Sequence, residues 1–180
     1  MIHVVDYDPR WPLVFEELRA TVSAAVGDMA LSIEHVGSTS VPGLAAKPVI
    51  DMDIVVAESD VAHAIEGLGK IGYTHRGDLG IPFREAFRPP PGSHPHHLYV
   101  CPAHSPALAN HLAFRDYLRG NAAATREYGA LKKSLAGDFS HDIDGYVEAK
   151  TGFIVAVLKK VGLSTEALAE IERMNRRTAR

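Results

Sequence analysis

Two carboxylates, Asp51 and Asp53, lie two positions apart in an apolar segment, residues 49–56. Side chains alternate between the two faces of a β-strand, so these carboxylates are predicted to point the same way, with Met52 and Ile54 on the opposite face. Carboxylates side by side on a buried strand repel each other, and a cation between them relieves that repulsion. Hard oxygen ligands suit Mg²⁺ or Mn²⁺, so we predict a divalent-metal site at Asp51 and Asp53.

A Gly-Ser pair, Gly37 and Ser38, comes shortly before this segment and follows an apolar run. Backbone N–H groups and a hydroxyl in such a turn can bind a phosphate. The same two residues could instead form a tight turn and cap a short helix, and both interpretations can hold together. Ser40 and Lys47 lie in the same loop, where Lys47 could neutralise a phosphate or simply cover the surface. With the carboxylate pair, the loop predicts metal-dependent phosphoryl or nucleotidyl transfer.

This spacing resembles the nucleotidyltransferase superfamily typified by DNA polymerase β, in which a Gly-Ser pair precedes a D-x-D strand. A closer resemblance, to the GrpB family, extends over nearly the whole chain. It rests on five segments: residues 7–12, 35–51, 96–100, 114–119 and 128–132. The resemblance implies a nucleotidyltransferase-like fold, sometimes found fused to dephospho-CoA kinase.

The usual superfamily site has a third carboxylate on a neighbouring strand. The matching segment here, residues 96–101, contains no acid, and alternation places His97, Tyr99 and Cys101 on one face. We predict that His97 takes the third position and that Tyr99 faces the same cavity, with Glu85 as another candidate for the third acid. Two acids and a histidine could bind one metal and a nucleotide without transferring anything.

Several basic side chains could bind phosphate, although arginines on helices are more commonly solvated or ion-paired. They are Arg84, Arg88, Arg115, Arg119, Lys132 and Lys150. Histidines also cluster, together with a cysteine, at His94, His96, His97, Cys101 and His104. Imidazole and thiolate suit Zn²⁺. Because His96 and His97 point to opposite faces of a strand, we expect no dedicated zinc site there.

The composition is that of a soluble globular protein, with 46% apolar and 23% charged residues in 180. This length predicts a single domain, with a nucleotidyltransferase-like α/β core at 1–105 and a helical part at 106–180. The net charge of -3 argues against general nucleic-acid binding. We expect a cytoplasmic protein without membrane association, because the chain shows no signal-peptide pattern and no membrane-length apolar run, and carries one cysteine.

Periodicity predicts strands in the first hundred residues and helices afterwards. Strands are expected at 30–36, 49–56, 73–76, 82–88 and 96–101. Helices are expected at 9–27, 61–71, 106–119, 122–136, 143–161 and 164–178, the first of them starting at Asp8-Pro9 and ending at Gly27. This order predicts an α+β fold, with a nucleotidyltransferase-like mixed β-sheet, flanking helices and a C-terminal helical bundle.

The function predicted from these residues is transfer of a nucleoside monophosphate from a nucleoside triphosphate to an unknown acceptor. Asp51 and Asp53 would hold Mg²⁺ or Mn²⁺, Gly37 and Ser38 would bind the phosphates, and His97 would complete the site or act as general base. One alternative is a non-catalytic nucleotide or CoA-precursor binding module. Another is a metal-dependent hydrolase that uses the histidines.

Overall fold

The computed structural model describes residues 1–176, and the backbone forms two compact units. The sheet unit consists of Asp8–Ser40 and Pro48–Leu112, whereas the helical unit consists of Met1–Tyr7, Val41–Lys47 and the described part of Ala113–Arg180. The bounds of these units differ from the predicted parts 1–105 and 106–180. The predicted end of the last helix, at 178, lies outside the described residues.

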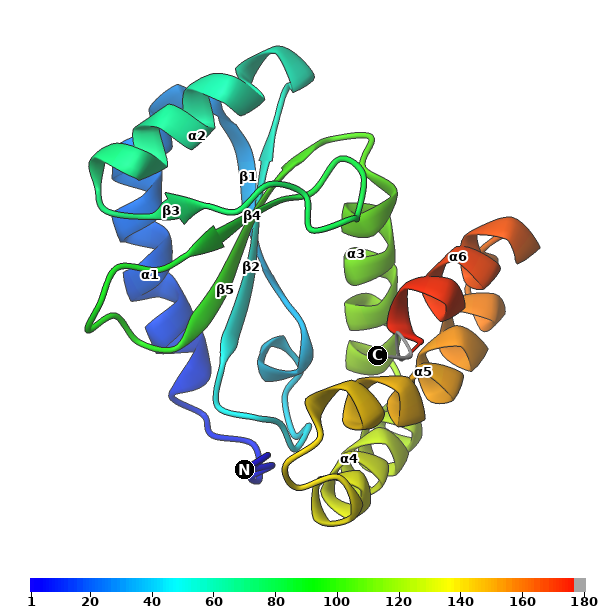
Figure 1. Ribbon diagram of the computed structural model, residues 1–180. Coiled ribbons are helices and arrows are strands. Elements are labelled where there is room, and N and C mark those ends of the chain that lie inside the picture. The colour runs from blue at the N-terminus through cyan, green and yellow to red at the C-terminus, as the bar shows by residue number, and fades with distance from the viewer. Residues whose placement is uncertain (177–180) are drawn as a thin grey trace. The chain divides into compact units, whose positions relative to one another are not determined.

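Strands of the described chain form one five-stranded mixed sheet in the order β1-β2-β5-β4-β3 (Figure 1). The strands are β1 (Ala30–Val36), β2 (Ile50–Val56), β3 (Thr74–His75), β4 (Glu85–Arg88) and β5 (His96–Pro102). β2 and β5 run parallel, and the other neighbouring pairs run antiparallel. The predicted α+β class with a mixed sheet is therefore confirmed.

β2 lies inside the sheet, between β1 and β5. On one face Ile50, Met52 and Ile54 are fully buried, and on the other Asp53 and Val55 are buried while Asp51 is partly exposed, so the strand is covered on both faces except around Asp51. In the parallel register with β5, Asp51 lies opposite His97. Residues opposite each other in a sheet share a face, so β2 and β5 present polar side chains side by side.

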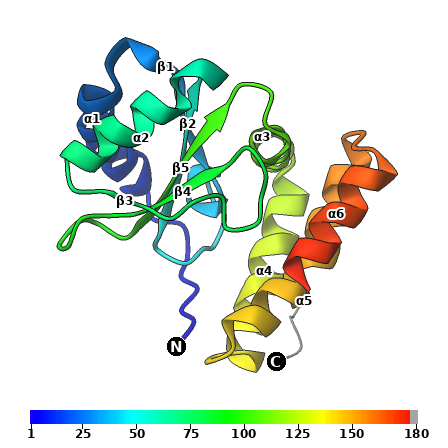
Figure 2. The same ribbon diagram turned by 45° about the horizontal axis from the view of Figure 1, so that its top comes forward.

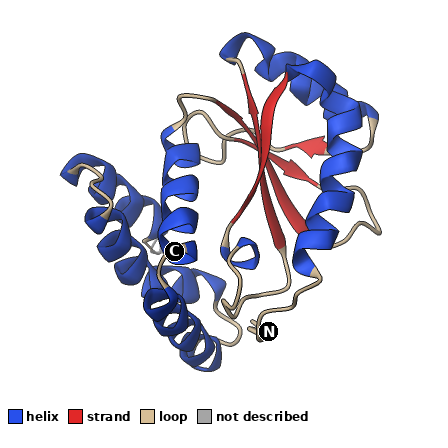
Figure 3. Ribbon diagram, turned by 180° about the vertical axis from the view of Figure 1, so that it is seen from behind, coloured by secondary structure: helices blue, strands red, loops and turns tan. Residues whose placement is uncertain are grey.

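Helices α1 (Trp11–Val26) and α2 (Val61–Lys70) pack on the Met52 face of the sheet (Figures 1 and 2). His35, which lies opposite Met52 in the register, stacks on Phe15 of α1 with ring centroids 4.6 Å apart. Figure 3 shows α1 beside the sheet from behind. The start of α3 (Pro106–Arg119) covers only one end of the Asp51 face, where Leu108 joins a cluster with Val55 and Cys101.

The first helix begins at Trp11, later than predicted. The Asp8 carboxylate does not cap it; it accepts hydrogen bonds from the Arg10 backbone N–H at 2.9 Å and from the Arg10 guanidinium. Pro12 occupies the first turn instead, where its missing N–H costs no helical hydrogen bond. Gly27 ends the helix with a φ of 55°, as predicted.

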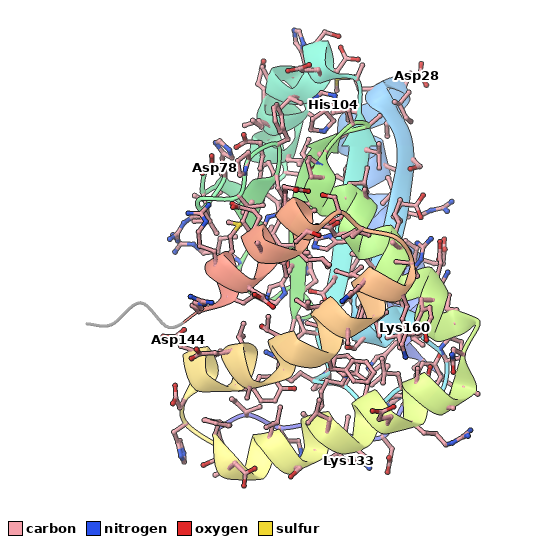
Figure 4. All side chains as sticks on the ribbon, turned by 90° about the vertical axis from the view of Figure 1, so that its right-hand side faces the viewer. Asp28, Asp78, His104, Lys133, Asp144 and Lys160 are labelled. Carbon is pink, nitrogen blue, oxygen red and sulfur yellow. The ribbon has the colours of Figure 1, made fainter. Side chains whose placement is uncertain are left out.

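The helical unit contains α4 (Ala122–Asp138), α5 (Ile143–Lys160), α6 (Thr165–Asn175) and the end of α3. Asn121, Asp142 and Ser164 cap α4, α5 and α6, each accepting a backbone hydrogen bond three residues on. Lys133 of α4, labelled in Figure 4, forms an ion pair with Asp6 at 2.6 Å. A buried core joins the helices to the loop 41–47: Val41, Leu44, Leu118, Ala124 and Tyr128.

Within residues 1–176, the helices are too short or too polar to cross a lipid bilayer.

Candidate functional site

The two predicted carboxylates share one face of β2 but differ in exposure. The Asp53 side chain is 0% exposed, whereas the Asp51 side chain retains 30%. On the neighbouring strand, His97 lies opposite Asp51, and Tyr99 lies opposite Asp53. The prediction that His97 and Tyr99 share the carboxylate face is therefore confirmed.

Each carboxylate contacts a histidine. His97 Nδ1 lies 2.7 Å from Asp51 Oδ1, and the His97 side chain remains 53% exposed. His111, in α3, places its Nδ1 2.7 Å from Asp53 Oδ2. The site thus has an outer Asp–His pair open to solvent and an inner pair around a fully buried carboxylate.

The other oxygen of Asp53 is one of two buried side-chain atoms, among the described residues, that lack a hydrogen-bond partner. Asp53 Oδ1 is buried, and the described residues offer it no hydrogen-bond partner. A buried carboxylate oxygen without a donor or cation is strongly unfavourable. Oδ1 is therefore suited to a ligand that the described protein atoms do not supply, and a divalent cation is the simplest such ligand.

Gly37 ends β1 against the Asp51 carboxylate. Its φ is 68°, and a Cβ added at this position would lie 2.1 Å from Asp51 Oδ2. Only glycine admits that approach. The following turn, η2 (Ser38–Ser40), is held by the Ser40 hydroxyl, which donates to the Gly37 carbonyl at 2.6 Å, and by Thr39, which donates to the Val49 carbonyl. The Gly-Ser loop is thus built around Asp51, while the phosphate roles of Ser38 and Ser40 stay predictions.

Arg84 brings a positive charge to the carboxylate face through its contact with Tyr99. The Arg84 guanidinium lies over the Tyr99 ring, 4.4 Å from its centroid. Arg84 Nε is buried without a hydrogen-bond partner among the described residues. Burial raises the pKa of Tyr99 to about 12, with Arg84 opposing the shift and the two aspartates adding to it. Tyr99 is therefore neutral at physiological pH, and Arg84 supplies the positive charge.

The environment of His111 also favours its charged form. Burial lowers the pKa of this imidazole, but the hydrogen bond to Asp53 and the negative charges of Asp53 and Asp51 outweigh burial, so the net pKa is raised. His111 was not predicted as a site residue. Helical periodicity predicts that it lies on a helix, but not that this helix packs against the distant strand that carries Asp53. The predicted helix at 106–119 was the available signal.

The proposal of Glu85 as a third acid is wrong. Glu85 lies opposite Val100 in the sheet register, so it belongs to the face opposite Asp51. Its carboxylate binds His75 Nε2 at 2.6 Å instead. The acid that does share the carboxylate face is Glu34 of β1, which lies opposite Asp53 and is partly buried. Sequence reasoning missed Glu34 because it considered only one neighbour of β2.

The histidine cluster does not converge. His96 is buried on the opposite face, with Nε2 2.8 Å from the Tyr73 hydroxyl. Burial raises the pKa of the Cys101 thiol to about 12, which disfavours the thiolate that zinc requires. His104, labelled in Figure 4, lies 3.9 Å from Glu58. Across residues 1–176, the His, Cys, Asp and Glu side chains include no group of three arranged to hold a metal ion.

The predicted phosphate ligands Lys47, Arg115 and Lys132 belong to the helical unit. Lys132 is only 2% exposed, and its ammonium lies 4.6 Å from the centroid of the Tyr128 ring. Lys47 lies 5.8 Å from the centroid of Tyr146. Arg115 forms an ion pair with the aspartate that follows it in the chain. The roles of these three residues toward phosphate stay predictions.

The mixed sheet, with its D-x-D strand beside a Gly-Ser turn, has a nucleotidyltransferase-like fold. The structure of Cid1 in complex with the UTP analog UMPNPP supports that fold, with a TM-score of 0.51, 15% identity, and coverage of 84% of this chain and 49% of that chain. The sequence profile described as GrpB protein matches residues 1–160. The chain therefore belongs to the GrpB family.

Relatives with known sequence or structure agree with this assignment. The crystal structure of the conserved protein GrpB from Enterococcus faecalis has a TM-score of 0.79 and 37% identity, covering 93% of this chain and 98% of that chain. The UPF0157 protein YqkA of Bacillus subtilis is 35% identical over 85% of this chain. This chain spans only 45% of the length of YqkA. The UPF0157 protein BH1888 of Halalkalibacterium halodurans is also 35% identical, over 88% of this chain, and the match covers 82% of that protein.

A further relative carries an enzyme name. The dephospho-CoA kinase of Mycolicibacterium paratuberculosis is 28% identical over 83% of this chain, and the matched region is 43% of that protein.

Proposed function

We propose that the sheet unit binds a divalent cation together with a nucleoside triphosphate and transfers the nucleotidyl group to an acceptor. The observation that carries this proposal is Asp53 Oδ1, a fully buried carboxylate oxygen that lacks a protein partner beside a second carboxylate. The nucleotidyltransferase-like fold supports the choice of reaction class.

The donors fit a hard cation. Asp51 and Asp53 supply two carboxylates on one face of β2. Protein-bound Mg²⁺ is commonly held by one or two carboxylates. The bound cation would neutralise charge on the phosphates. Among the protein's own groups, Gly37 allows the Asp51 carboxylate to lie directly against the backbone of the turn, since a Cβ there would lie 2.1 Å from Asp51 Oδ2.

His97 is the group best placed to move a proton. Its Nδ1 hydrogen-bonds to Asp51 Oδ1, and an Nδ1–H donor leaves Nε2 as a proton acceptor. The half-exposed ring can reach an acceptor hydroxyl. In the proposed step, the acceptor oxygen bonds to the α-phosphorus, its proton passes to His97 Nε2, and the bond from the α-phosphorus to the bridging oxygen breaks to release pyrophosphate.

Arg84 would contribute a fixed positive charge. Its guanidinium is ordered on the Tyr99 ring, and its position on the carboxylate face suits it to oppose negative charge on a bound triphosphate.

A second candidate is nucleotide or CoA-precursor binding without transfer. It is favoured by the lack, within residues 1–176, of a third acidic or imidazole ligand arranged around one metal position. The named dephospho-CoA kinase relative is consistent with a ligand of the CoA pathway.

One experiment tests both candidates. Calorimetry with Mg²⁺ and a non-hydrolysable triphosphate analogue should show binding that Asp53→Asn weakens by at least tenfold, as about one to two orders of magnitude is typical for metal-site changes. Glu85→Gln is the matched control, since it neutralises an acid on the opposite face of the sheet. Pyrophosphate release from ATP, CTP, GTP or UTP supports transfer, whereas binding without release supports the second candidate. Equal binding by Asp53→Asn and the native protein would refute the metal-dependent transfer candidate.

A further inference from the structure

His111 forms a hydrogen bond to one of the two proposed metal-binding carboxylates, although His111 is not itself a proposed metal ligand. It lies in the second turn of α3, and its Nδ1 is 2.7 Å from Asp53 Oδ2. The bond joins a helix to the interior of the sheet, where the partner carboxylate is completely buried. The two oxygens of Asp53 therefore lie in different environments. Oδ2 contacts the His111 imidazole, whereas Oδ1 has no protein partner among the described residues.

The start of α3 is anchored on both sides of His111 along the chain. Leu108, three residues earlier, packs with Val55 and Cys101, and Leu112, the next residue, packs against the same cluster. Residues three positions apart on a helix share a face, so the packing that fixes Leu108 also directs His111 toward the sheet. The ring is restricted further by Tyr99, with centroids 6.2 Å apart.

We propose that His111 is a positioning residue for the metal site, one that holds Asp53 Oδ2 so that Oδ1 is presented to the cation. This inference rests on the proposed function. A carboxylate can turn about its Cβ–Cγ bond, and a hydrogen bond to one oxygen fixes the direction of the other. Outer partners of this kind orient metal-binding carboxylates and typically change metal affinity by about 10- to 100-fold when removed.

A positioning role requires a hydrogen-bond donor at the place of His111 Nδ1. Asparagine places its amide nitrogen where histidine places Nδ1, because both are bonded to Cγ. Glutamine places its amide nitrogen one bond further out, and leucine supplies no donor. A purely structural need for bulk would rank leucine and glutamine above asparagine, whereas a positioning role ranks asparagine first.

The test is calorimetric titration of the full chain with Mn²⁺ alone, for the native protein and for His111→Asn, His111→Gln and His111→Leu. We expect His111→Asn to bind Mn²⁺ within about threefold of the native protein and His111→Leu to bind at least tenfold more weakly, with His111→Gln close to leucine. Thermal unfolding without metal is recorded for each variant, and the Asn–Gln pair decides the question if His111→Leu does not fold.

Two results would overturn this inference alone: native Mn²⁺ affinity in folded His111→Leu, or equal losses in His111→Asn and His111→Gln. Failure of the folded native protein to bind Mn²⁺ would overturn the proposed function and this inference together. The two kinds of failure are thus distinguishable in one set of titrations.

Discussion

Gly37 is the residue at which backbone geometry and site chemistry constrain each other most closely. It combines a positive φ of 68° with a position where a Cβ would lie 2.1 Å from Asp51 Oδ2. Each constraint alone would favour glycine. Together they mean that the turn after β1 and the carboxylate of Asp51 occupy mutually dependent positions.

Replacing Gly37 by alanine should therefore cost more than backbone strain. We expect Gly77→Ala, at a similar φ of 70° with nothing within 4 Å of the new Cβ, to lower the free energy of unfolding by about 1 kcal/mol. Gly37→Ala should cost roughly 2 kcal/mol more, because overpacking adds to the strain. Denaturant unfolding measures both. Equal costs would show that Asp51 moves away freely and that the close approach is unimportant.

His96 provides a pH test on the sheet face opposite the proposed metal site. Burial lowers its pKa, although the hydrogen bond to the His94 carbonyl opposes the shift. The unfolded chain therefore takes up a proton near pH 6.5 that the folded protein resists, so the free energy of unfolding falls as pH drops through that value. This contribution is complete above the unfolded pKa and levels off below the folded one.

We predict that His96→Phe removes this pH dependence. On acidification from pH 7.5 to pH 5.5, the free energy of unfolding should fall less for the variant than for the native protein. The difference between the two falls should be at most about 1.4 kcal/mol per pH unit. Urea unfolding at several pH values supplies the comparison, and the other histidines cancel because both proteins carry them. Parallel pH profiles would mean that His96 is protonated as readily folded as unfolded.

At the scale of elements, strand pairing decides which acids gather. The alternation within β2 was predicted from sequence, and the superfamily resemblance implied that residues 96–101 form the neighbouring strand, so His97 was expected on the face of Asp51. Glu85 was assigned to the wrong face because its register with β5 depends on where β4 begins, and the sequence does not mark that residue. His111 reaches Asp53 through tertiary packing of α3, which no local pattern encodes.

The same logic makes β1 testable. Glu34 shares the face of Asp53, whereas Glu85 does not. We expect Glu34→Gln to weaken Mn²⁺ binding by about three- to tenfold, since removing a nearby negative charge reduces the attraction for a cation. Glu85→Gln should leave the affinity unchanged. A larger loss from Glu85→Gln than from Glu34→Gln would contradict the assigned faces.

At the scale of the whole molecule, the chain passes repeatedly between its two units. Residues 1–7 and 41–47 belong with the helices, although they flank segments of the sheet unit in sequence. The predicted division at residue 106 could not show this, because it was drawn from the order of strands and helices along the chain. The carboxylate face lies within the sheet unit, so the proposed metal site uses residues of that unit alone.

A survey of the whole crystal for bound metal tests the proposed site at Asp51 and Asp53 directly. Crystals of the full chain soaked in Mn²⁺ should show an anomalous difference peak beside Asp53, about 2.1 Å from Oδ1, with Asp51 as its second carboxylate ligand. Crystals of Asp53→Asn should lose that peak. A peak beside His94 or His104 in place of the aspartates, or no peak at the aspartates at saturating Mn²⁺, would show that Asp51 and Asp53 do not form a metal site.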